Sequence, residues 1–169
     1  MPTGSEYVVD WAEFEKHLFD QLVTLPERVI FIIGPGENQR PYIQFAGIHA
    51  FSENDMDITC GFQDDVGFDR KFTPEEEAFF VECNFERRGD DPTYWEQEVP
   101  WPPSGQALLK MVRGCMVRLR DVAAVASPEE LTYRSWRNGG YGIGQFREMT
   151  YPADPDFDLP GLYLRRIES

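Results

Sequence analysis

Cysteine and histidine are scarce in this chain, and none of them is spaced as a metal-binding motif requires. No C-x-x-C pair occurs, and neither histidine has a second histidine or a cysteine at ligand spacing. The acidic stretch 64–69 lacks the alternating oxygen ligands and the final glutamate of a calcium loop, so we interpret it as a polar turn. We therefore expect no metal ion and no cofactor. The residues behind this expectation are Cys60, Cys83, Cys115, His17 and His49.

The chain also lacks long hydrophobic runs. Its N-terminal M-P-T-G-S-E-Y has neither the basic region nor the apolar core of a secretory signal, and no apolar run approaches the length of a membrane span. An odd number of cysteines without such a signal is typical of a reducing compartment. We expect a cytoplasmic protein that does not bind membranes.

Basic residues are outnumbered by acidic ones, 16 to 30, which gives a formal net charge of -14. A field of this sign repels nucleic acid and anionic membrane surfaces, and it favours solubility or a basic partner. Basic and aromatic residues do not interleave as they do on a nucleic-acid platform. We therefore expect no nucleic-acid partner.

Catalytic signatures are missing as well. The sequence has no G-x-S-x-G elbow, no P-loop and no H-E-x-x-H, and the glycine-rich stretch 139–144 is not followed by the helix that a phosphate site needs. Glu96 and Glu98 share one face of a predicted strand, but nothing in the sequence drives their pKa values apart as an acid and base pair requires. We expect no catalytic residues and a protein that is not an enzyme.

The first half of the chain contains clear helix and strand signals. Asp10 followed by Glu13 is a capping-box pattern, and Thr73-Pro74-Glu75-Glu76 is a second helix start. Pro26 ends the first helix. Between the helices the β-branched and alternating patterns predict three strands, and after the second helix we expect a polar turn. The strands are expected at 29–33, 41–49 and 56–62, and the turn at 87–91.

The second half continues with a strand over 94–99 that has two unlike faces. Trp95, Gln97 and Val99 face one way, and Tyr94 faces the other way with the two glutamates. A long helix is expected from near Ser104, then one helical turn at 127–130 and a last strand at 131–136. The apolar stripe of the long helix is Leu108, Val112, Cys115, Leu119 and Val122.

This order predicts an α+β fold in which a mainly antiparallel sheet packs with helices, in the order α-β-β-β-α-β-α-β plus a C-terminal extension. We place the domain at 8–137 and the extension, a hairpin or a wrapping tail, at 138–169. The extension is acidic and contains several prolines.

Aromatic residues near strand ends are the candidates for a binding surface. Aromatic side chains supply a large contact area and lose little conformational entropy on binding. The alternative is that they only pack in the core and its rim, which we favour for Trp95 and leave open for Trp101 and Trp136. The candidate partner-binding residues are Tyr94, Trp95, Trp101, Tyr133, Arg134 and Trp136.

Several segments of the chain form a pattern together. They are W-A-E-F-E-K-H-L, P-Y-I-Q-F-A, the [ST]-P-E-E helix starts, P-T-Y-W-E-Q-E-V-P, L-L-K-M-V-R-G-C-M-V-R-L-R-D-V and S-P-E-E-L-T-Y-R-S-W. Together they resemble the TY-Chap domains, relatives of type III secretion chaperones and YbjN proteins. The resemblance covers about residues 8–137, and none of its motifs is catalytic.

This resemblance implies a secretion-chaperone-like fold and a role in binding a peptide or protein client. In related chaperones a client segment is held against an apolar surface of the sheet and helices. By the same analogy the chain forms a homodimer through its long helix. The extension is not covered by the pattern, and one interpretation is that it occupies the groove itself.

Two other hypotheses stay open at this point. The charge suits an acidic immunity or inhibitor protein that blocks a basic toxin such as a nuclease, because it would steer a fast and salt-sensitive association. An enzyme comes third, since the sequence offers no convergent set of titratable groups.

Overall fold

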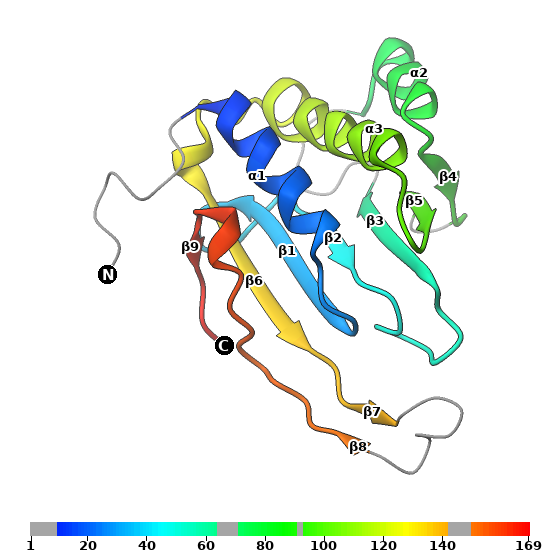
Figure 1. Cartoon of the computed structure of the whole chain (residues 1–169). Helices are drawn as coiled ribbons and strands as arrows, with labels where there is room; N and C mark the ends of the chain where they lie inside the picture. The colour runs from blue at the N-terminus through cyan, green and yellow to red at the C-terminus, as the bar shows by residue number, and fades with distance from the viewer. Residues whose placement is uncertain (1–9, 64–70, 91–92, 142–149) are drawn as a thin grey trace.

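A seven-stranded sheet organises the computed structural model, which describes residues 10–63, 71–90, 93–141 and 150–169 (Figure 1). The acidic stretch 64–69 and the glycines at 142 and 144 lie outside these residues. Neighbouring strands pair antiparallel except β6 with β9, which confirms the predicted α+β class. From one edge to the other the strands are β4 (Glu86–Arg88), β5 (Tyr94–Pro100), β3 (Asp57–Gln63), β2 (Ile43–Ala46), β1 (Val29–Pro35), β6 (Leu131–Arg137) and β9 (Arg165–Arg166).

Three α-helices lie together on one face of this sheet, as Figure 1 shows. They are α1 (Trp11–Val23), α2 (Pro74–Glu82) and α3 (Gly105–Met116), and α3 runs on without a break into a π-helical segment, Val117–Val122. Helices α1 and α3 pack side by side. Each helix begins where the sequence predicts, because a side-chain oxygen satisfies a backbone N–H group that would otherwise lack a partner.

The helix caps are those that the sequence predicts. Asp10 Oδ1 accepts a hydrogen bond from the backbone N–H of Glu13 at 2.8 Å. Thr73 and Glu76 form a full capping box, in which each backbone N–H donates to the side chain of the other residue, at 2.8 and 3.2 Å. Ser104 Oγ accepts from the backbone N–H of Ala107 at 3.1 Å, which fixes the start of α3.

The core lies between the helices and the sheet. Every second residue of the long strands points to the helices; Phe31 of β1 and Phe45 of β2, for example, stack with ring centroids 4.6 Å apart. The whole predicted stripe of the long helix, from Leu108 to Val122, is buried in this layer. Burying a side chain of this size stabilises the fold by about 1.5–3 kcal/mol.

The opposite face of the sheet, which we call the outer face, has no described helix over it. The alternating burial of β3 and β5 shows which side chains it carries, because residues that alternate with the core positions are half-buried or exposed. Cross-strand register places Arg134, Ile32, Gln44, Gly61 and Glu96 in one row across this face, each opposite the next.

The C-terminal segment adds to both the sheet and the core. Strand β7 (Gly140–Tyr141) pairs with β8 (Thr150–Tyr151), and the chain then returns along the edge of β6. Leu159, Leu162 and Leu164 are 2%, 0% and 8% exposed and join the core beside α1. The last strand, β9, then pairs with β6 in the parallel direction.

One short strand differs from the sequence prediction. The segment 87–91 was expected to be a polar turn, yet Arg87 and Arg88 belong to β4, which pairs with the edge of β5. A three-residue edge strand rich in charge has the composition of a turn, because its charged side chains face water. The charged residues of β4 therefore do not distinguish this strand from a turn in the sequence.

Candidate functional site

A groove opens on the outer face where the C-terminal segment runs along β6. Arg137 and Asp154 exchange two backbone hydrogen bonds, at 2.7 and 2.9 Å, and the backbone N–H of Phe157 donates to the carbonyl of Ser135 at 3.1 Å. Between these contacts β6 has one residue, Trp136, whereas the segment has two, 155 and 156. The extra residue bends the segment away from β6, as a β-bulge does, and leaves the groove between them.

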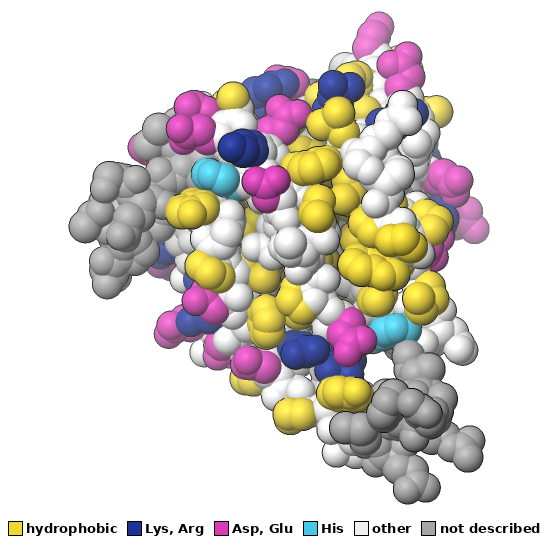
Figure 2. Space-filling view, in the orientation of Figure 1, with side chains coloured by type: hydrophobic (Ala, Val, Ile, Leu, Met, Phe, Trp, Pro, Cys, Tyr) yellow, Lys and Arg dark blue, Asp and Glu magenta, His cyan; other side chains and the backbone are white. Residues whose placement is uncertain are grey.

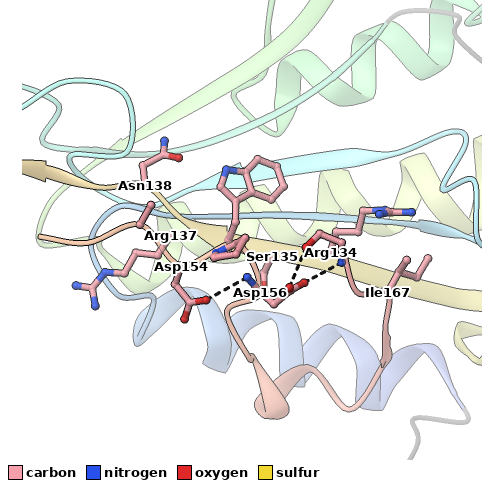
Figure 3. Close-up of a pocket in the computed structure, with 11 residues that line it drawn as sticks. Arg134, Ser135, Arg137, Asn138, Asp154, Asp156 and Ile167 are labelled. Atoms are coloured by element: carbon pink, nitrogen blue, oxygen red, sulfur yellow. Dashed lines mark hydrogen bonds between the residues drawn. The ribbon is translucent and has the colours of Figure 1, made fainter.

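The groove has a volume of about 600 Å³ and a largely apolar lining (Figure 3). Trp136 stands on the sheet side, packed against Ile30, Ala46 and Ala50, and a part of its ring system remains accessible. The opposite wall comes from the C-terminal segment and includes Ala153, Pro155 and Ile167. A concave site with an aromatic wall and a mostly apolar accessible surface suits an apolar side chain.

Charged side chains surround this apolar interior. Figure 3 shows Arg134 and Arg137 on β6 and Asp154 and Asp156 on the adjacent segment. Arg137 Nη2 lies 4.0 Å from Glu27 Oε1, so these two side chains form an ion pair. Arg134, which is half-buried, has no hydrogen-bond or ion-pair partner among the residues that the structure describes. A guanidinium can form two parallel hydrogen bonds with a carboxylate, so its placement in the groove allows such a pair.

The outer wall of the groove is held by Asp156. Its two carboxylate oxygens accept hydrogen bonds from the backbone N–H and the hydroxyl of Ser169, both at 2.8 Å. Both bonds lower the pKa of Asp156 below its ordinary value, and the bond from the backbone N–H has the larger effect. Arg166 donates to the carbonyl of the same aspartate at 3.2 Å, so β9 and the bulge are tied together.

The structure distributes the six sequence candidates over four places. Arg134 and Trp136 line the groove. Tyr94, which is 36% exposed, lies on the outer face at the other end of the sheet and lines a shallow pocket of about 210 Å³ above Gly61. Trp101, 39% exposed, stands at the end of β5, where its backbone N–H bonds the carbonyl of Met56.

The remaining two candidates point to the helices. Trp95 is 3% exposed and packs against Phe80, and Tyr133 is 2% exposed. The Tyr133 hydroxyl donates to Asp158 at 2.9 Å and accepts from the backbone N–H of Leu159 at 3.1 Å. Both side chains therefore belong to the buried core between the sheet and the helices.

The sequence did not single out the residues of the wall that the C-terminal segment provides. Ala153, Pro155 and Ile167 carry no motif, and their segment was predicted only as a hairpin or a wrapping tail, with the interpretation that it occupies the groove itself. The available signal was the set of spaced leucines at 159, 162 and 164, which an exposed tail would not require.

The described residues contain no group of three histidine, cysteine or carboxylate side chains placed to hold a metal ion. The three cysteines are free thiols in the core, and Cys60 and Cys115 lie with their sulfur atoms 3.6 Å apart. Burial raises the pKa of the Cys60 thiol, and the contact with Cys115 raises it further, which makes this thiol a poor nucleophile. None of the described helices is both long enough and apolar enough to span a membrane.

Figure 2 shows the face of the molecule that is in view in Figure 1, where apolar side chains reach the surface in several places between acidic and basic ones. The helix-backed, mainly antiparallel sheet belongs to the α+β class that the sequence predicts. The model of one family matches residues 5–137: TY-Chap3, described as T3SS (YopN, CesT) and YbjN peptide-binding chaperone 3. The chain belongs to this family, which confirms the expected membership.

Comparisons with curated proteins and with solved structures gave no match. The family match ends at Arg137, the last residue of β6, so it includes Arg134 and Trp136. The C-terminal segment that forms the other wall of the groove lies beyond it.

Proposed function

We propose that this chain is a non-enzymatic peptide-binding chaperone domain that holds an extended client segment on its outer face. The observation that carries this proposal is the apolar groove of about 600 Å³ beside Trp136. An apolar side chain of the client enters the groove, and a carboxylate near that side chain pairs with Arg134. The membership in a family of peptide-binding chaperones supports the same role.

The groove, rather than strand addition at β6, is the binding mode that this edge permits. The edge of β6 is already paired, with residues 154 and 157 of the C-terminal segment and with β9. A client strand would have to displace three leucines from the core to take their place. Burial of one client side chain the size of leucine or phenylalanine in the groove contributes about 1.5–3 kcal/mol, so several contacts are needed for tight binding.

The experiment is a selection of displayed random peptides on the full chain, followed by fluorescence anisotropy with the selected peptides. We expect selected peptides to share one large apolar residue, and the variant Trp136→Ala to weaken their binding at least tenfold. Trp101→Ala is the matched control, because it removes a partly exposed tryptophan that does not line the groove. Thermal melts of both variants test whether folding is intact.

Other outcomes decide against the groove. If Trp101→Ala weakens the peptides and Trp136→Ala does not, the binding surface lies at the end of β5. If Trp136→Ala lowers the melting temperature as well as the binding affinity, the ring contributes to the stability of the fold, and the loss of binding does not locate the client. A selection that yields no peptide on a well-folded chain would contradict the proposed role.

Dimerisation and location belong to the same proposal. A homodimer through α3 would use exposed positions such as Gln106 and Arg113, because the apolar stripe of α3 is buried within its own chain. Sedimentation measurements test whether this homodimer forms.

The proposed location is the reducing cytoplasm. The three free thiols of the chain are consistent with it.

The acidic inhibitor stays the alternative hypothesis, and the net charge of -14 is the observation that favours it. Salt separates the two functions. An inhibitor steered by the net charge of -14 would lose association rate steeply between low and high salt, whereas binding through the apolar groove would change little.

A further inference from the structure

A second pocket lies at the opposite edge of the sheet, where β4 stops beside β5. Strand β4 begins at Glu86, opposite Glu96, and the two residues before it turn away towards α2 through Asn84, whose φ is +68°. The pocket left beside β5 has a volume of about 440 Å³. Its lining is mostly polar, and it includes Gln97 and Glu98 from the part of β5 that β4 does not reach.

The free edge of β5 offers backbone groups to this pocket. The backbone N–H of Trp101 donates to Met56, next to β3, so alternate residues of β5 direct their backbone groups to β3. By that alternation the N–H and C=O of Glu98 point to the other side, where no described strand pairs with them. Pro100 lies on the same edge, where its lack of an N–H costs no hydrogen bond.

The pocket carries an excess of negative charge. The guanidinium of Arg88 contacts Glu96 at 2.9 Å, Glu98 at 3.3 Å and Glu86 at 3.2 Å, so one cation serves three carboxylates. Burial raises the pKa of Glu96; Arg88 opposes this effect, and the neighbouring Glu98 adds to it. A second cation in the pocket would therefore stabilise the ionised form of Glu96.

An acidic cluster alone often only faces water, but here a buried acceptor is also without a donor. Gln97 is 3% exposed and lines the pocket, and its Oε1 atom has no hydrogen-bond partner among the described residues. A donor that enters the pocket beside Gln97 is the group that would satisfy this oxygen. A group with several N–H donors and a positive charge meets both needs at once.

We propose that this pocket is a subsite for a lysine or arginine side chain of the bound client segment. The proposal rests on the proposed peptide-binding function and names the chemistry of its ligand. Carboxylates of the three glutamates neutralise the incoming charge, and the amide oxygen of Gln97 accepts one of its N–H groups. The free backbone groups of Glu98 align the client beside the pocket.

The outer face connects this subsite with the Trp136 groove. The row Arg134, Ile32, Gln44, Gly61 and Glu96 runs from the groove to the pocket, and all five residues are partly accessible. Four strand spacings of about 4.8 Å separate its ends, a span of about 19 Å. An extended chain covers that span with roughly six residues. We therefore expect a basic residue in the client roughly six to eight positions from its apolar anchor.

The test is an NMR titration of the ¹⁵N-labelled full chain with N-acetyl-arginine methylamide. We expect saturable shifts of the Gln97 side-chain amide and of the backbone amides of Glu86 and Glu98. The matched probe, N-acetyl-citrulline methylamide, has the same shape without the charge and should give shifts at least fivefold smaller at equal concentration. Equal shifts with both probes, or unsaturated shifts spread over all acidic surfaces, would overturn the subsite.

Variants locate the effect at the pocket. Glu98→Gln should weaken the arginine probe at least fivefold, whereas Glu37→Gln, which removes the same charge from an exposed site outside the pocket, should leave it within twofold. If Glu98→Gln fails to fold, Glu86→Gln, whose side chain is 73% exposed, replaces it. An identical response of the two positions would contradict the assignment.

The same measurements separate this subsite from the proposed function. Selected peptides that need Trp136 but show no basic residue, together with a silent arginine probe, would remove the subsite and keep the peptide-binding role. If the arginine probe gives saturable shifts but the chain selects no peptide, the subsite is kept and the peptide-binding role is contradicted. Trp136→Ala should not change the probe titration, since the groove and the pocket share no residue.

Discussion

Arg134 and Glu96 stand at opposite ends of one cross-strand row on the outer face, although 37 positions separate them in the sequence. One end of the row has a guanidinium, without a partner among the described residues, beside an apolar groove. The other end has carboxylates beside a polar pocket. A client that lies along this row would therefore bind in one direction. Its acidic group would lie near Arg134 and its basic group near Glu96.

Gly61 lies next to Glu96 in this row and leaves a shallow depression there. A side chain at this position would stand on the outer face, and its Cβ would approach only the Trp95 carbonyl, at 3.4 Å. We expect Gly61→Thr to keep or raise the melting temperature, because threonine favours strands. The same change should weaken selected peptides about fivefold or more by filling the depression. Gly61→Thr that binds peptides normally would show that the client does not cross the row.

The hydroxyl of Tyr133 fixes the C-terminal segment to β6. Tyr133→Phe removes one hydrogen bond to Asp158 and leaves the buried N–H of Leu159 without an acceptor. We expect a loss of about 1–3 kcal/mol in the free energy of unfolding, measured by urea denaturation. Tyr94→Phe is the control, and it should change stability by less than about 0.5 kcal/mol because that ring is on the surface. If the two changes lower the free energy of unfolding equally, the Tyr133 hydroxyl does not fix the C-terminal segment.

The same tyrosine makes stability depend on alkaline pH. Burial raises the pKa of Tyr133 to about 12, from about 10 for an unperturbed tyrosine. Between these values the unfolded chain releases the proton and the folded chain keeps it. The stabilisation is therefore complete below pH 10 and is lost as the pH rises towards 12. Absorbance titration of the seven tyrosines should show one group with a midpoint near 12, and this group should be absent in Tyr133→Phe.

The three leucines of the C-terminal segment should be necessary for folding. Leu162 is fully buried, so Leu162→Ala should lower the free energy of unfolding by about 2–5 kcal/mol. Val23→Ala, at a 44% exposed position of α1, should lower it by less than about 0.5 kcal/mol. Urea denaturation measures both.

Removal of the whole segment tests the same point more severely. A chain that ends at Asn138 loses three buried leucines, worth about 5–9 kcal/mol in total, which is close to the entire stability of a typical domain. We expect circular dichroism to show no cooperative melt for it. A melt close to that of the full chain would mean that the core is complete without this segment.

Local structure was predictable where short-range chemistry decides it. The caps at Asp10 and Thr73 formed as their sequence patterns indicate, because both partners lie within one helical turn. The two faces of β5 were also predicted, since alternation follows directly from strand geometry. Strand β4 was missed, because three charged residues at a sheet edge do not differ from a turn in composition.

The candidate site was predicted only in part. The sequence selected Trp136 and Arg134 but also Trp95 and Tyr133, which point into the core. Which face of a strand becomes the core depends on where the helices pack, and aromatic residues suit both faces equally well.

The sequence by itself determined the positions of the helices, most of the strands, the stripe of α3 and the family resemblance. These depend on spacing between near neighbours along the chain. Only the tertiary structure decided that the C-terminal segment joins the core, that it forms a wall of the Trp136 groove, and that one row of side chains links Arg134 to Glu96. These features depend on strand order and register. Strand order and register arise from packing between distant segments, so local periodicity carries no record of them.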